Sequence, residues 1–204
     1  MVRTLSLCCV CSCVLASPVG AQPAVSKTPE ELQALYEARQ ADFDYLLGDW
    51  EFTAESAQFG EFRGYWSAVR LDGGQIVDEY RVVGDDGATF FLTTTIRAYN
   101  ALLDRWELIG MDRGNGLQDF GTAQRDGDEM RIEQRYGMLG PNPTVRRITY
   151  SQIAPNSFSW ASDLSTDTGK TWAVNDLRIE ARRTGAPRLL GPLAVAREVE
   201  ADPQ

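Results

Sequence analysis

Ten runs of alternating apolar and polar residues fill the chain from Trp50 to about Arg183 and constrain its fold more than any other feature. Each run is rich in strand-forming residues and ends at a turn of Gly, Asp or Asn, as at residues 72–74, 84–87 and 125–128. The short links between successive runs predict an antiparallel meander. The predicted strands lie at 49–56, 61–71, 75–84, 88–98, 104–112, 117–125, 128–136, 144–154, 157–164 and 171–183.

A meander of this many strands closes most economically into an up-and-down barrel, because closure removes the exposed strand edges. We therefore expect an all-β fold, a ten-stranded antiparallel barrel over residues 42–183 with one short helix in front of it. A flattened sandwich is the alternative, since strand spacing does not separate the two. A length of 204 residues suits a single domain.

Two segments in front of the first strand have their own signals. Thr28 and Glu31 form the two halves of a capping box around Pro29, which predicts a helix that runs to about Gln40. Residues 43–50, FDYLLGDW, place several large apolar side chains side by side. We expect this segment to be the plug on which the barrel closes.

The first 21 residues have the parts of a secretory signal peptide. Arg3 is the positive start, residues 5–16 are apolar, and the small residues Val19 and Ala21 favour cleavage after Ala21. The apolar stretch is shorter than the roughly 20 residues that span a bilayer. We therefore expect a secreted or periplasmic protein; a buried apolar N-terminal segment is the alternative. The expected organisation is a signal peptide at 1–21, a linker and helix at 22–41, the barrel at 42–183 and a flexible acidic tail at 184–204.

The four cysteines, at positions 8, 9, 11 and 13, all lie inside the expected signal peptide. The mature chain would then have no disulfide, no zinc ribbon and no catalytic thiol. The residues before Cys13 make a poor acylation motif, so we do not expect a lipid anchor. The chain has no histidine, the commonest metal ligand and the usual general base at neutral pH. We expect no metal and no cofactor.

The chain is acidic, with a formal net charge of −9 that removal of Arg3 would bring to about −10. An acidic surface repels phosphate backbones, so nucleic acid is not an expected partner. The composition leaves the oligomeric state open.

Aromatic residues are spread over the predicted strands, with one tryptophan in each of five runs. Aromatic side chains give a ligand pocket large flat contact areas, and a ten-stranded barrel is wide enough to hold a cavity. Ordinary core packing is the alternative interpretation. As contacts for a small apolar or amphipathic molecule we expect Trp66, Tyr80, Trp106 and Trp160, with Arg97 or Arg147 orienting its polar end.

Several charged residues in the strands are candidates for an inward ion pair, although alternation does not show which face points inward. The candidate cations are Arg97, Arg146 or Arg147, and Arg178 or Arg182, and the candidate partners are Glu79, Asp112, Asp163 and Asp176. Pairing on the outer surface is the alternative, worth about 0.2–1 kcal/mol per pair.

Five motifs follow one another along the chain: FDYLLGDWEF, Trp66 with LDGGQIVDEY, IRAYNALLDRWELIGMD, SFSWASDLSTDTGKTW and RIEARR. Their order resembles a family of secreted bacterial proteins of unknown function with a lipocalin-like, or calycin-like, barrel, similar in fold to nitrobindin-type barrels. In the late motif Asp163 stands where Glu is usual, and Thr168 interrupts a Gly-Gly pair. The nitrobindin-like haem function needs a proximal histidine, which this chain lacks, so the resemblance implies the barrel and its cavity without that cofactor.

Three functions are compatible with these features. The first is a secreted or periplasmic barrel that binds a small, largely apolar ligand. The second is a cofactor-independent isomerase, cyclase or lyase, in which Glu79, Asp112 or Asp163 moves a proton while a Tyr or Arg steadies the developing anion. The third is an interaction module of the cell envelope.

Overall fold

The computed structural model describes residues 27–137, 140 and 143–188, and the expected signal peptide and most of the expected tail lie outside these residues. A helix, α1 (Pro29–Arg39), and a single 3-10 turn, η1 (Asp44–Leu46), precede the strands. The strands are β1 (Gly48–Ser56), β2 (Gly60–Arg70), β3 (Ile76–Val83), β4 (Thr89–Asn100), β5 (Arg105–Asp112), β6 (Gly116–Asp126), β7 (Glu129–Tyr136), β8 (Thr144–Ala154), β9 (Ser157–Ser165) and β10 (Ala173–Gly185).

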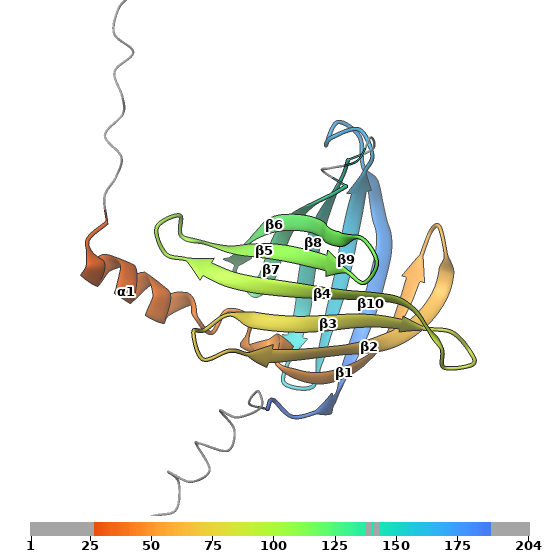
Figure 1. The fold of residues 1–204 in the computed structure, drawn as a ribbon, viewed down its shortest axis with the longest axis horizontal. Helices are drawn as coiled ribbons and strands as arrows, with labels where there is room; N and C mark the ends of the chain where they lie inside the picture. The colour runs from red at the N-terminus through yellow and green to blue at the C-terminus, as the bar shows by residue number, and fades with distance from the viewer. Residues whose placement is uncertain (1–26, 138–139, 141–142, 189–204) are drawn as a thin grey trace, which may run out of the picture.

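The strands form a closed antiparallel barrel in which each strand pairs with the next and β1 pairs with β10 (Figure 1). This confirms the predicted architecture, and each strand begins and ends within two residues of its predicted run. The largest differences are at β4 and β10, which continue two residues further. β10 does so because Gly185 still pairs with Asp49 on β1.

The connections alternate between the two ends of the barrel. Figure 1 shows α1 and the β2–β3 and β4–β5 loops at one end, and the β1–β2 and β3–β4 loops at the other. Helix α1 begins with the predicted capping box, since Thr28 N–H donates to Glu31 Oε2 at 2.7 Å and Glu31 N–H donates to Thr28 Oγ1 at 3.2 Å. The helix has no buried residue and lies outside the barrel, where it contacts β4. Among the described residues there is no helix of the length and apolarity needed to cross a membrane.

The end of the barrel next to α1 is plugged, as predicted, by the segment around η1. Phe43 and Leu46 are fully buried, and the ring of Phe43 meets that of Trp106 edge to face at 5.1 Å. Trp50 Nε1 donates to Leu46 O at 2.8 Å, which ties the plug to β1. Apolar contacts and one buried hydrogen bond therefore close this end.

Arg183 on β10 holds the plug segment in place at this end of the barrel. Its guanidinium lies 4.1 Å from the centre of the Trp50 ring and donates to the carbonyls of Tyr45 and Leu47. Gly48, the first residue of β1, has φ +104°, and a Cβ there would lie 2.5 Å from the carbonyl oxygen of Gly185. Only glycine fits this position, because a side chain would both clash and force an unfavourable backbone conformation.

Candidate functional site

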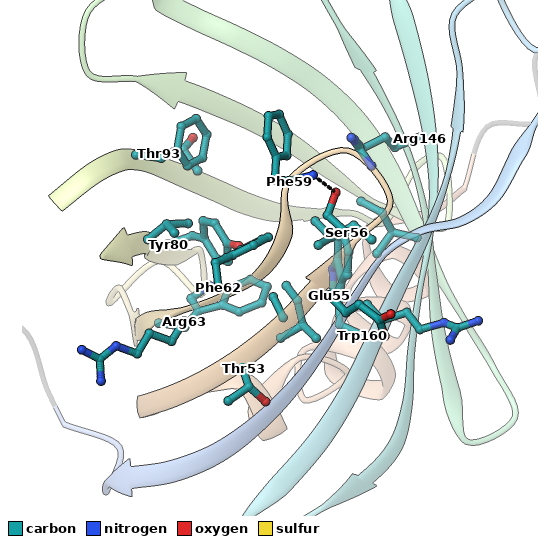
Figure 2. Close-up of a pocket in the computed structure, with 18 of the residues that line it drawn as sticks. Thr53, Glu55, Ser56, Phe59, Phe62, Arg63, Tyr80, Thr93, Arg146 and Trp160 are labelled. Carbon is teal, nitrogen blue, oxygen red and sulfur yellow. Dashed lines mark hydrogen bonds between the residues drawn. The ribbon is translucent and has the colours of Figure 1, made fainter. Parts of the chain in front are cut away.

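A cavity of about 1350 Å³ opens at the end of the barrel opposite the plug. Phe59 in the β1–β2 turn and Asp85 in the β3–β4 turn lie at its mouth. In Figure 2, Tyr80 and Phe62 reach into this space from one side and Arg146 from the other. The volume includes space around the outside of β1, where Thr53 and Glu55 belong to the lining.

One part of the wall is aromatic and aliphatic. The ring of Tyr80 stacks on Phe52 at 4.8 Å and meets the ring of Trp66 edge to face at 5.3 Å. Phe52 reaches this position because β2 has Gly64 opposite it, where a Cβ would lie 2.5 Å from the Phe52 ring. The apolar part of the wall includes Phe62, Trp66, Tyr80, Phe91, Ile132, Ile148 and Trp160.

A buried ion pair lies deeper in the cavity. The side chains of Asp78 on β3 and Arg97 on β4 are 1% and 3% exposed and contact each other directly. Asp78 Oδ1 also accepts a hydrogen bond from Trp66 Nε1 at 2.6 Å, and the Arg97 guanidinium lies 5.3 Å from the centre of the Phe43 ring. Burial raises the pKa of the neighbouring Tyr150 to about 12, while Arg97 acts to lower it. Tyr150 therefore stays protonated at neutral pH.

A second ion pair joins β8, whose Arg146 lines the cavity, to Asp176 on β10. Arg146 Nη1 donates to Asp176 Oδ2 at 3.0 Å and to Ser162 Oγ at 2.8 Å. Arg146 is thus the inward member of the two adjacent arginines on β8, and Asp176 is the predicted partner that meets it.

A third polar group, Asp119 on β6, has no cation paired with it in the part of the chain that the structure describes. Asp119 is 4% exposed and accepts one hydrogen bond, from Gln134 Nε2 to Oδ1 at 2.8 Å; Tyr136 in turn donates to Gln134 Oε1 at 3.1 Å. The carboxyl lies over Gly110 on β5, where a Cβ would be 2.0 Å from Asp119 Oδ2. Burial raises the pKa of Asp119 to about 6, although Gln134 and Arg97 act to lower it.

The raised pKa of Asp119 predicts a pH-dependent contribution to stability. Between about pH 4 and pH 6 the native state keeps a proton that the unfolded chain has released, so the free energy of unfolding falls as pH rises through this window. A shift of about two pKa units corresponds to about 3 kcal/mol. Relative to Asp119→Asn, the wild type should therefore lose about 3 kcal/mol between pH 4 and pH 7, measured by urea unfolding at each pH. A difference that does not change with pH would contradict this role.

Four of the six residues predicted to bind a ligand, Trp66, Tyr80, Arg97 and Trp160, line the cavity. The other two lie elsewhere. Trp106 is buried against the plug, where its Nε1 donates to Asp42 Oδ2 at 3.3 Å. Arg147 lies on the outer face of β8 with its guanidinium 3.9 Å from the centre of the Trp172 ring, because strand alternation turns its neighbour Arg146 inward.

The three carboxylates considered for catalysis do not line the cavity either. Glu79 pairs with Arg81 at 2.6 Å, and both side chains are more than 40% exposed. Asp112 accepts from the backbone N–H of Gly114 in the β5–β6 turn, and Asp163 accepts from the backbone N–H of Asn175 at 2.9 Å. Strand alternation places Asp78 inside the barrel and Glu79 outside. Asp112 holds the backbone of a turn in place, and Asp163 holds the backbone of β10 where its pairing with β9 is irregular.

Sequence reasoning missed the chain of Asp119, Gln134 and Tyr136. One signal was present, because glycine inside a strand often marks a close approach of another group. Gly110 accommodates the Asp119 carboxyl, and Gly121 packs against the Gln134 side chain. The described residues contain no cluster of three potential metal ligands.

Comparison with known proteins shows similarity in fold only. No family model matches the chain, and no curated protein matches it. The structure of Rv2717c from M. tuberculosis is 14% identical over 74% of this chain and 97% of that chain, with a TM-score of 0.51. The redesigned β-barrel mFAP1, bound to DFHBI, is 16% identical over 69% of this chain and 96% of that chain, with a TM-score of 0.38.

Proposed function

We propose that this protein is a secreted or periplasmic barrel that binds a small, largely apolar molecule in its cavity. The observation that carries the proposal is a cavity of about 1350 Å³ whose wall combines aromatic rings with a few buried polar groups. Ligand pockets commonly have this composition, since apolar surface supplies affinity and a few fixed polar groups orient the ligand. The polar groups in this wall include Arg97, Arg146 and Asp119.

The proposed location rests on the signal-peptide features of residues 1–21. The motif order that resembles secreted bacterial barrel proteins supports the same location. Outside the cytoplasm, a largely apolar site inside the barrel would shield a poorly soluble molecule from water, because transfer of apolar surface out of water is favourable.

A matched pair of substitutions on β4 tests whether the cavity is the binding site. Thr93 lines the cavity, whereas Thr94 points to the outer face of the same strand. Thr93→Trp should fill part of the space and weaken binding of a neutral apolar dye at least tenfold, while Thr94→Trp should leave the affinity unchanged. Fluorescence titration of the dye measures both, with circular dichroism to establish that each variant is folded. Equal affinities for the two variants would place binding outside the cavity.

Native mass spectrometry of the mature protein from its own host, followed by denaturing extraction, tests occupancy. A stoichiometric small molecule that is absent from folded Thr93→Trp would identify the natural ligand. An empty wild-type protein that also binds no apolar dye would overturn the proposal.

A second candidate function, proton-transfer catalysis, is favoured by Asp119. A buried carboxyl whose pKa lies near 6 can both give and take a proton near neutral pH. If the barrel is an isomerase, cyclase or lyase, Asp119→Asn should still bind the extracted molecule but no longer convert it. If the barrel is a carrier, the wild-type protein should release the molecule chemically unchanged. Mass spectrometry of the released compound distinguishes the two functions.

A further inference from the structure

The charged groups in the interior of the barrel do not balance. Asp78 pairs with Arg97, and Asp176 pairs with Arg146, so each cation already has an anion in direct contact. Asp119 is a third buried carboxyl, and no cation is paired with it among the described residues. When ionised it leaves the interior with one negative charge in excess.

Asp119 also has an unused hydrogen-bonding atom. Its Oδ1 accepts from Gln134, but its Oδ2 has no hydrogen-bond partner among the residues that the structure describes. A carboxylate with 4% exposure loses most of its hydration, and one amide hydrogen bond replaces only part of it. The groups that face it are Gly110 from β5 and Gln134 and Tyr136 from β7, with Arg97 acting from a distance. None of these neutralises its charge by direct contact.

The rest of the lining suits positive charge. The rings of Tyr80, Phe91 and Trp160 line the same cavity, and aromatic faces attract ammonium groups. Apart from the residues discussed above, the charged residues of the lining are four carboxylates, Glu55, Glu61, Asp85 and Glu180, and two arginines, Arg63 and Arg178. Carboxylates are thus in excess, and the net charge of the chain is −9. A field of this sign raises the local concentration of cations and repels anions.

We propose that the ligand is an amphipathic organic cation, a protonated amine with an apolar body, whose nitrogen binds at Oδ2 of Asp119 while its apolar part lies against the aromatic wall. This inference rests on the proposed binding function and adds the charge of the ligand to it. The two arginines then hold the inward carboxylates of Asp78 and Asp176 and do not receive the ligand.

Three probes with the same apolar body separate the possibilities: decylamine, decanol and decanoate, titrated into the mature protein at pH 7.5 by isothermal calorimetry. Decylamine should bind at least tenfold more tightly than decanol, and decanoate should bind most weakly. Asp119→Asn should bring the affinity for decylamine to that for decanol. Glu79→Gln, which removes a carboxylate from the outer face, is the matched control and should keep the preference for the amine.

A second measurement needs no variant. A bound ammonium favours the ionised form of Asp119, so decylamine should release a fraction of a proton on binding at pH 6, whereas decanol should release none. Titrations in two buffers of different ionisation enthalpy measure this release. Equal affinity for amine and alcohol, tighter binding of decanoate, or the absence of proton release would each overturn the cation proposal while leaving the cavity proposal intact. Failure of all three probes to bind would instead contradict the binding function itself.

Discussion

Replacing Arg97 by Met is expected to lower the free energy of unfolding by about 3–5 kcal/mol, because it leaves Asp78 as a buried and uncompensated charge. Met keeps much of the apolar volume, so the expected cost comes from the lost charge and its hydrogen-bonding capacity. Among the described side chains, only Trp66 Nε1 would still donate a hydrogen bond to Asp78. Chemical unfolding at pH 7 measures the change.

Two further variants isolate the cause of that loss. Arg81→Met removes the cation of an exposed pair with Glu79 and should cost less than about 1 kcal/mol. Adding Asp78→Asn to Arg97→Met removes the orphaned charge but keeps an acceptor for Trp66, and should recover most of the lost stability. If Arg97→Met cost no more than Arg81→Met, the buried pair would not contribute as argued.

The second large effect is expected at the plug, where Phe43→Ala should cost about 3–5 kcal/mol. Phe43 is fully buried and packs edge to face against both Trp106 and Tyr150. The substitution leaves a void at the closed end, since the barrel strands cannot move inward to fill it. Urea unfolding measures the cost, and a red shift of tryptophan fluorescence should report water near Trp106.

Phe59→Ala is the matched control, the same chemical change at the opposite end of the barrel. Phe59 is 72% exposed in the β1–β2 turn, so its loss should change stability by no more than about 0.5 kcal/mol. Similar costs for the two phenylalanines would mean that the segment around η1 does not close the barrel.

The elements of this fold could be predicted from sequence because their signals are local. Strand period and turn residues located all ten strands, and the capping box of Thr28 and Glu31 located the start of α1. Each of these patterns depends on residues a few positions apart. The apolar density of residues 43–50 likewise indicated a buried plug.

The candidate site was predictable only in part. Trp66, Tyr80, Arg97 and Trp160 line the cavity, but Arg147 does not. Its neighbour Arg146 points inward instead, and a sequence that has arginine at both positions does not say which one faces the interior. An error of one residue in assigning the inward set moves a side chain to the opposite face of the sheet.

The sequence by itself determined that this protein is a meander of ten strands behind a capped helix and an apolar plug, because hydrophobic period, caps and turns act over short stretches of chain. Only the tertiary structure decided which charges meet. The pairing of Asp78 with Arg97 and of Arg146 with Asp176, and the unpaired position of Asp119 over Gly110, depend on the register between strands and on the closing of β1 against β10. Burial and the distances between charges together decide the chemistry of the cavity. Both exist only once the barrel has closed.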